Sequence, residues 1–163
     1  MAAKQAPPTH SADRPEAGQT WRGWIAVGLG WLLPGLGHVY LGRLRQGLLF
    51  GAIIWSAFGL GLANDGRLAL RDERQPLLTG LQIVANLGVG PADMIARRSV
   101  YGELAYRLPD EQARGADEQR AEIFRGRARS GVSIYGTAYL WTAGLMNLLL
   151  LFDVWDIGRG RNP

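Results

Sequence analysis

Apolar and charged residues are separated into long blocks along this chain, whereas an amphipathic helix of a soluble protein mixes them within every turn. Four stretches are almost free of charged side chains. Each is close to the roughly 20 residues needed to cross the ~30 Å hydrocarbon core of a bilayer. They predict spans at about 23–42, 46–64, 76–95 and 132–154. The pattern therefore predicts an all-α fold, a polytopic helical membrane bundle of about four transmembrane helices within one membrane domain, 21–163.

The four predicted spans differ in the strength of their patterns. The fourth is the strongest, because Leu145 to Phe152 is a dense apolar run, and Tyr135 and Trp155 stand about 20 residues apart, where two aromatic belts would lie. The third is the weakest, since polar residues, several glycines and Pro91 interrupt it. We expect the third stretch either to cross the membrane or to be only partly inserted.

The first predicted span contains a helix-breaking sequence. Pro34 lacks an amide proton and clashes with the preceding turn, while Gly35 and Gly37 tolerate unusual backbone dihedrals. The helix is therefore predicted to kink or end at Pro34, with Gly35 to Gly42 forming a broken segment. At membrane depth such a break is tolerated only where protein or water covers the freed backbone groups.

Two regions outside the spans are polar. Residues 1–20 carry three prolines and scattered polar side chains, and they predict a disordered tail rather than a signal peptide. Residues 96–129 form the one sizeable polar loop. Within it, Asp117 to Arg129 has acidic residues early and arginines late, which matches a helix dipole and predicts a short helix. This helix either lies on lipid headgroups or belongs to a solvated linker.

The charge pattern changes this picture little. The chain carries a net charge of +4, and every basic residue except Lys4 is arginine. Arginine pairs well with phosphate, so nucleic acid or lipid headgroups are the candidate partners; arginines that flank spans favour the lipid bilayer. For four spans the basic residues divide almost evenly between the two sides, so the count leaves the orientation open; the tight Arg43/Arg45 turn and the arginines of 97–129 favour those two loops as cytoplasmic. The absence of cysteine excludes disulfides, thiolate metal sites and cysteine nucleophiles.

A polar side chain inside a membrane is costly, so each one requires an explanation. His38, in the broken segment, could be a metal ligand, a proton relay or a contact to a lipid headgroup; the favoured interpretation is that it caps freed carbonyls. The spans contain no second histidine, which argues against a metal site.

Two groups of polar residues follow helical spacing. Gln82, Asn86 and Asp93 share one face of a continuous helix and form a polar seam, which would line a solute path or, as we favour, make hydrogen bonds between helices. Asp153 and Asp156 share a face at the end of the last span. They would bind a cation or act as acid and base, or, as we favour, pair with nearby arginines in the headgroup zone.

Catalytic signatures are absent: the chain has no G-x-S-x-G, no H-E-x-x-H and no P-loop. We therefore predict no catalytic residues, no cofactor and no metal.

The segment Trp31-Leu-Leu-Pro-Gly-Leu-Gly-His-Val-Tyr-Leu-Gly42 resembles the hairpin turn of uncharacterised bacterial multi-pass membrane families, Pro-Gly-x-Gly-His-x-Tyr-x-Gly. It is similar to the first half of the TM-two domain, and Asp153 is similar to the aspartate that closes the second helix of that domain. The resemblance covers about a third of the chain, and Val39 departs from the phenylalanine of the domain. It implies a helical hairpin, with the candidate turn residues Pro34, Gly35, Gly37, His38, Tyr40 and Gly42.

These observations lead to three functional hypotheses. The first is a small non-enzymatic membrane protein of the cytoplasmic membrane that packs against itself or other membrane proteins through its 34–47 turn. The alternative is a small transporter or channel subunit that uses the Gln82/Asn86/Asp93 seam. The least favoured is lipid-headgroup chemistry through His38 and the Asp153/Asp156 pair. No nucleic acid partner is expected.

Overall fold

The computed structural model describes residues 17–102, 104, 106, 107 and 115–160. Within these residues it is helical and contains no named strand, only an isolated bridge between Arg71 and Arg107. The helices are α1 (Ala17–Leu32), α2 (Leu36–Tyr40), α3 (Leu44–Ala63), α4 (Pro76–Leu87), α5 (Pro91–Tyr101), α6 (Ala116–Arg129) and α7 (Ser133–Gly158). The all-α prediction is confirmed.

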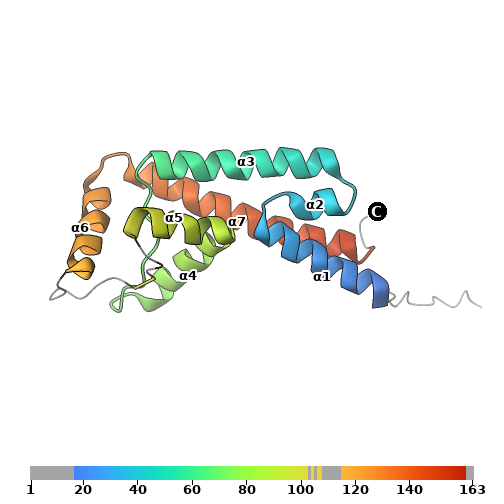
Figure 1. Ribbon diagram of the computed structural model, residues 1–163, viewed down its shortest axis with the longest axis horizontal. Coiled ribbons are helices and arrows are strands. Elements are labelled where there is room, and N and C mark those ends of the chain that lie inside the picture. The colour runs from blue at the N-terminus through green and yellow to red at the C-terminus, as the bar shows by residue number, and fades with distance from the viewer. Residues whose placement is uncertain (1–16, 103, 105, 108–114, 161–163) are drawn as a thin grey trace, which may run out of the picture.

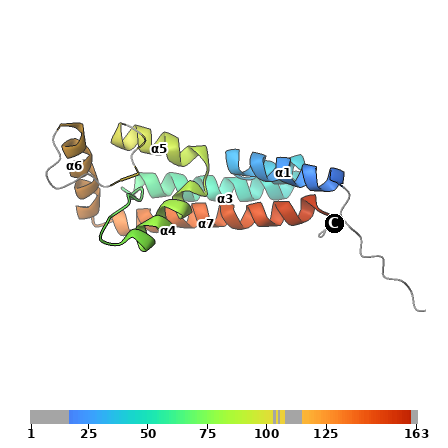
Figure 2. The same ribbon diagram turned by 90° about the horizontal axis from the view of Figure 1, so that it is seen from below.

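Two long helices, α3 and α7, lie side by side along the length of the molecule (Figures 1 and 2). They are antiparallel, because Gly61 near the end of α3 packs on Leu140 near the start of α7, while His38, just before α3, contacts Asp153 near the end of α7. At 1.5 Å per residue, their 20 and 26 residues extend ~30 Å and ~39 Å. Both are long and apolar enough to cross a membrane.

The helices α1 and α2 form a short hairpin that packs on the C-terminal half of α7. Helix α1 ends at Leu32, and Gly35 adopts φ 91°, a left-handed conformation that favours glycine. The predicted break at Pro34 is confirmed. Gly37 on the returning arm packs against the carbonyl of Ala26, so that the two arms approach as closely as small residues allow.

The helices α4 and α5 form a second hairpin, where the sequence pattern predicted one helix over 76–95. Helix α4 ends at Leu87, and Gly90 takes φ 76° before Pro91 begins α5. Two glycines and a proline within four residues stop the first helix and restart the chain in a new direction. The stretch is therefore not one continuous helix, and the polar seam predicted on its face is divided between two helices.

The hairpins are arranged in opposite directions. In chain order, each hairpin is followed by one of the two antiparallel long helices, α3 after the first and α7 after the second. The first hairpin lies along the half of α7 near Val154, and α4 lies along the half near Thr137 (Figures 1 and 2). Both hairpins thus pack on α7, one along each half of it.

Helix α6 lies across one end of the bundle, beside the C-terminal end of α3 and the N-terminal end of α7 (Figure 1). The short helix predicted over Asp117 to Arg129 is observed, beginning one residue earlier. The predicted polar loop, 96–129, also holds the last turns of α5. Of the predicted disordered tail, residues 17–20 belong to α1, and 1–16 lie outside the described residues.

The bundle has a buried apolar core, which includes Ile54, Leu140 and Ala143, and it also exposes many large apolar side chains. Large apolar side chains are exposed on α1, α3, α4 and α7, and Leu77, Ile134 and Leu149 are at least two-thirds exposed. Polar and charged side chains are buried as well, namely His38, Asn86, Asp93, Arg97, Ser133, Thr137 and Asn147. Each of these buried groups requires a hydrogen-bonding partner, and most of the partners define the candidate site.

Candidate functional site

The two helix breaks meet at Asn147, in the middle of α7. Its Nδ2 donates one hydrogen bond to the carbonyl of Gly30 at 3.2 Å and another to the carbonyl of Gly88 at 2.8 Å. Gly30 lies in the last turn of α1, and Gly88 follows the last residue of α4. Because both helices leave their final carbonyls without intrahelical partners, one side-chain amide caps two helix ends.

The two breaks also contact each other directly. The indole Nε1 of Trp31 donates to the carbonyl of Leu87 at 3.1 Å, linking the end of α1 to the end of α4. In return Gly90 packs on the carbonyl of Trp31 so closely that any Cβ at position 90 would clash with it. We call this meeting point of the two helix ends, formed by Trp31, Gly30, Gly88, Gly90 and Asn147, the junction.

Glycine also brings α4 onto α7 beside the junction. A Cβ on Gly144 would clash with the carbonyl of Ala85, and one on Gly88 would clash with the carbonyl of Gly144. Asn86 lies in this contact and is 2% exposed. Neither polar atom of its side chain has a hydrogen-bond partner in the described part of the chain, and the same holds for Oδ1 of Asn147.

A buried ion pair closes the end of the bundle near α6. On α5, Arg97 Nε donates to Asp93 Oδ2 at 2.7 Å, one helical turn apart, and both side chains are fully buried. Arg97 Nη1 also donates to the carbonyl of Ala69 at 2.8 Å, and its guanidinium stacks over the ring of Tyr106. The pair therefore fastens α5 to the segment that links α3 to α4.

Tyr101 strengthens the same attachment. Its hydroxyl donates to the carbonyl of Leu68 at 3.2 Å, one residue before the carbonyl that Arg97 holds. Burial raises the pKa of the Tyr101 hydroxyl above its ordinary value, so that it remains a donor at neutral pH. Leu68, Ala69 and Leu70 are buried as a result, although the chain there forms no helix.

At the opposite end of the bundle, His38 pairs with Asp153. His38 Nε2 and Asp153 Oδ2 are 2.9 Å apart, although the residues are 115 positions apart in the chain. The imidazole is buried and meets Phe50 edge-on, while the carboxylate is about half exposed. The sequence suggested that His38 caps freed carbonyls; in the structure its described partner is a carboxylate. Asp156 lies one turn further along α7 and is partly exposed.

The remaining turn candidates have distinct positions. Pro34 and Gly35 are buried against Gly47 and Gly51 of α3, where a Cβ on either α3 glycine would crowd the turn. Gly42 adopts φ 84° in open space, and Tyr40 is about two-fifths exposed. These positions shape the connection between α2 and α3.

The three seam candidates are separated by the break. Gln82 lines a cleft of ≈ 250 Å³ near α6, together with Thr79, Thr137 and Trp141. Asn86 lies one turn nearer the junction, inside the α4–α7 contact. Asp93 lies on α5 and is engaged by Arg97.

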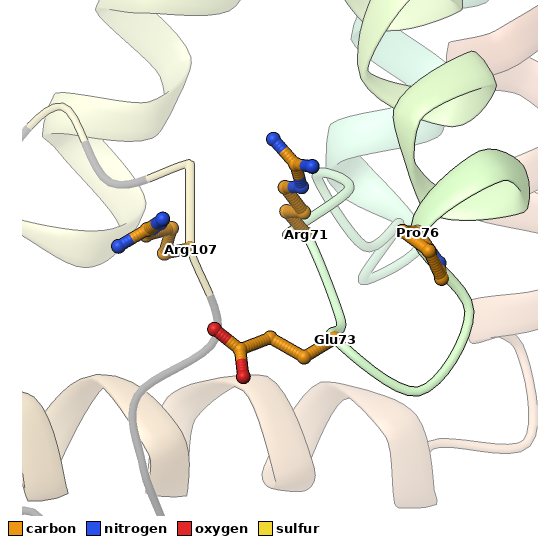
Figure 3. Close-up of a pocket in the computed structure, with 4 residues that line it drawn as sticks. All are labelled: Arg71, Glu73, Pro76 and Arg107. Atoms are coloured by element: carbon orange, nitrogen blue, oxygen red, sulfur yellow. The ribbon is translucent and has the colours of Figure 1, made fainter.

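A second cleft, of ≈ 290 Å³, opens at the same end of the bundle, between the segment before α4 and the chain after α5. Arg71, Glu73, Pro76 and Arg107 line it (Figure 3). The two guanidinium groups point in different directions in Figure 3, so they do not converge on one anion. No cluster of three or more histidine, cysteine or acidic side chains suited to a metal occurs in the described ranges.

Three important residues were not singled out from the sequence as candidates. Arg97 follows Asp93 by four positions, a spacing that does signal a helical ion pair. Asn147 stands within the most apolar run of the chain, where hydropathy conceals a single polar side chain. Trp31 acts through its indole nitrogen on a helix 56 residues away, and no local pattern reveals that contact.

Comparison with known proteins places the chain in a family whose function is unknown. The model of a family of unknown function, DUF6677, matches residues 25–162. The chain belongs to this family. The match begins within α1 and includes the rest of the described bundle, with the junction. No curated protein and no solved structure matches the chain.

Proposed function

We propose that this DUF6677 member is a non-enzymatic, multi-pass protein of the cell membrane that serves as a packing or interaction partner for other membrane proteins or for itself. The observation that carries the proposal is the large number of exposed apolar side chains on the helices, together with buried and hydrogen-bonded polar groups such as Arg97 and Asn147. In water this surface would expose apolar area far beyond that of an ordinary monomer. In lipid it is the expected outer face.

The two long helices support a membrane location. Only 28% of the most apolar window in each of α3 and α7 is buried within the protein, whereas a core helix of a soluble protein is mostly buried. Their remaining surface is left for lipid. At ~30 Å or more, each is long enough to cross the hydrocarbon core once.

The hairpins fit a half-crossing arrangement better than two further crossings. Helix α4 has 12 residues and extends ~18 Å, about half of a bilayer, before the chain turns back at the junction. Helix α1 approaches the same point from the other end of α7. We therefore propose two full crossings, α3 and α7, with the hairpins α1–α2 and α4–α5 entering from opposite faces. The non-helical backbone at the tips of the hairpins is tolerated at membrane depth because other parts of the protein cover it.

This topology also favours an orientation. Among the described residues, the end of the bundle near α6 holds ten arginines and the other end holds four. The first set is Arg67, Arg71, Arg74, Arg97, Arg98, Arg107, Arg120, Arg125, Arg127 and Arg129; the second is Arg22, Arg43, Arg45 and Arg159. Loops rich in arginine remain in the cytoplasm, so we place the α6 end on the cytoplasmic side.

A labelling experiment tests the topology. The chain has no cysteine, so no native cysteine has to be removed. Single cysteines introduced at Arg45, Arg71, Ala128 and Gly160 can each be tested for labelling from either side of the membrane. Two crossings with opposed hairpins place 45 with 160 on one face and 71 with 128 on the other. Four full crossings would instead place 45 with 128 and 71 with 160. If the protein washes off membranes in carbonate, the membrane proposal itself fails.

The packing role follows from how the polar groups are used. Histidine, aspartate and arginine side chains that could perform chemistry are engaged with one another, as in His38–Asp153 and Asp93–Arg97. Such groups hold elements together and leave no described set of acid, base and nucleophile around a cleft. Purification in mild detergent after crosslinking in cells tests this role. Recovery of the protein only as a monomer without crosslinked partners would contradict it.

One observation favours a second candidate function, that of a small transporter or channel subunit. Transporters often form their sites where two interrupted helices meet near the centre of the membrane, as α1 and α4 do here. Gln82 and Asn86 lead from the cleft near α6 toward that point. Solute or ion flux into vesicles that hold the purified protein, abolished by Asn86→Leu, would favour this function over packing alone.

A further inference from the structure

The cleft of ≈ 250 Å³ at the end of the bundle near α6 is lined by two opposite charges. Arg67 and Asp72 both belong to the segment between α3 and α4, and both line this cleft. Phe124 of α6 and Trp141 of α7 form further parts of its wall. Four parts of the chain therefore enclose one space that contains a guanidinium group, a carboxylate and apolar surface.

The two charged side chains do not neutralise each other. The described contact of the Arg67 guanidinium is with the ring of Phe124, whose centroid is 5.9 Å away. In the described part of the chain no carboxylate lies within ion-pair distance of this guanidinium. The carboxylate of Asp72 accepts from the backbone N–H of Arg74 at 2.9 Å through Oδ1, which leaves Oδ2 for another donor. Both charges are therefore available to a ligand.

Unused hydrogen-bond donors among the lining residues indicate what the ligand offers. Nε of Arg67 and Nε1 of Trp141 are buried without a hydrogen-bond partner among the residues that the structure describes. The hydroxyls of Thr79 and Thr137 in the same cleft are engaged, since each accepts from a backbone N–H and donates to a backbone carbonyl. Buried donors without acceptors are rare in proteins. Oxygen atoms of a phosphate would supply the acceptors that these donors lack.

In the proposed topology this cleft lies where headgroups meet hydrocarbon. Helix α7 extends ~39 Å and the hydrocarbon core ~30 Å, so each end of α7 projects ~4 Å beyond the core. Thr137 and Trp141 follow the start of α7 by one and two turns, which places the cleft across this boundary. Next to it, Leu78 and Leu81 of α4 are exposed and share one face of that helix. This surface suits an acyl chain whose headgroup occupies the cleft.

We propose that the cleft binds the headgroup of phosphatidylethanolamine from the surrounding bilayer, an inference that rests on the membrane location proposed above. The phosphate accepts from the side chains of Arg67 and Trp141, and the ammonium group donates to Asp72. A phosphatidylglycerol headgroup has no amine, so its negative charge would lie near Asp72 without compensation. The quaternary ammonium of phosphatidylcholine has no N–H to donate to this carboxylate.

The proposal is tested on the full chain purified in detergent, by measuring the melting temperature with added lipids that differ in headgroup and share the same acyl chains. We expect phosphatidylethanolamine to raise the Tm by about 5 °C, with saturation, relative to phosphatidylcholine and phosphatidylglycerol. Glycerophosphoethanolamine, which has the same headgroup but no acyl chains, distinguishes a lipid from a soluble ligand. At the same concentration it should give no rise.

Variants of the two charged residues assign the effect to the cleft. Arg67→Met removes the guanidinium but keeps the backbone N–H that donates to Thr137, and it should abolish the rise with phosphatidylethanolamine. Asp72→Asn keeps an oxygen for the backbone N–H of Arg74 and removes the negative charge. In this variant phosphatidylglycerol should raise the Tm at least as much as phosphatidylethanolamine, a reversal of preference that a purely structural role of Asp72 would not produce.

The matched controls are Arg71→Met and Glu73→Gln. They make the same changes of charge in the same segment, but both residues line the neighbouring cleft (Figure 3). Each control should keep the lipid preference of the wild type. General attraction between the positively charged end of the bundle and lipid would instead be weakened equally by Arg71→Met and by Arg67→Met.

Three results would overturn the proposal. The first is an equal Tm with all three lipids in the wild-type protein, which would leave the membrane location intact, whereas release from membranes by carbonate would refute that location itself. The second is an unchanged order of lipids in Asp72→Asn, which decides the matter even where Arg67→Met does not fold. The third is an equal rise with glycerophosphoethanolamine, which would assign the cleft to a soluble ligand.

Discussion

Replacing either Asp93 or Arg97 alone should be one of the most destabilising substitutions in this protein. Replacing both residues together should restore most of the lost stability. Both side chains are fully buried, and their hydrogen bond is 2.7 Å long. Removing one partner of a buried ion pair costs about 3–5 kcal/mol, because the other charge is left without compensation. We expect this loss of unfolding free energy for Asp93→Leu and for Arg97→Met alone.

The double variant Asp93→Leu/Arg97→Met tests whether the two costs share one origin. Replacing a buried pair by apolar residues of similar volume is often neutral. Here the carbonyl of Ala69 also loses its donor, which adds about 1 kcal/mol. The double variant should therefore be destabilised by only about 1–2 kcal/mol, far less than the sum of the single variants.

Thermal unfolding in detergent, followed by circular dichroism, measures these differences. For a chain of this size 1 kcal/mol corresponds to about 2–4 °C, so each single variant should melt about 10 °C below the wild type. The matched control is the Asp117–Arg120 pair on α6, which is also helical but has a half-exposed carboxylate. Asp117→Asn should cost less than about 1 kcal/mol. Additive effects of Asp93→Leu and Arg97→Met would refute the reasoning.

Three further predictions concern close packing and the two bonded ends. Gly144→Ala should cost about 3 kcal/mol or more, because its Cβ meets the backbone of α4, whereas Gly28→Ala, in open space on α1, should stabilise by about 0.5–1 kcal/mol; melting temperatures compare them. His38→Ala should cost about 2–3 kcal/mol through a cavity and a lost hydrogen bond, while Asp153→Asn, half exposed and still an acceptor, should cost less than about 1 kcal/mol; equal losses in chemical denaturation would argue against this asymmetry. Trp31→Phe keeps the ring but removes the indole donor, so urea titration should show a loss of about 1 kcal/mol, and no loss would mean that the contact between the breaks is unimportant.

Hydropathy predicted where the apolar helices lie but not whether each apolar stretch forms one helix. The stretch 76–95 has the composition of one crossing helix, and it folds as a hairpin of two shorter ones. A sliding window adds up transfer free energies and does not register a reversal of direction. The sequence did contain the reversal signal, because Gly88, Gly90 and Pro91 stand together. The same kind of signal at Pro34 predicted the first break correctly, where its position in the middle of a strong span made it conspicuous.

The contacts between buried polar side chains were harder to predict from the sequence than the two helix breaks. Both His38 and Asp153 were singled out from the sequence, yet their contact across 115 residues required the structure. The seam of Gln82, Asn86 and Asp93 assumed a continuous helix, and the break moved Asp93 onto α5. Asn147 was missed because a lone amide scarcely alters the hydropathy of Leu145 to Phe152. Its role depends on two carbonyls that arrive from α1 and α4, and neither is encoded near it.

The junction explains why the two hairpins depend on each other. Each hairpin reverses by ending a helix, and each such end leaves carbonyl groups without intrahelical partners in a place that excludes water. The carbonyl of Leu87 on the second hairpin accepts from the backbone N–H of Gly90 at 2.8 Å and from Trp31 of the first hairpin at 3.1 Å. Asn147 bonds one carbonyl from each hairpin, that of Gly30 and that of Gly88. Each hairpin bonds part of its own tip through backbone N–H groups, and the described donor to the carbonyls of Gly30 and Gly88 comes from α7. Both hairpins therefore depend on α7, which is the helix that joins their tips.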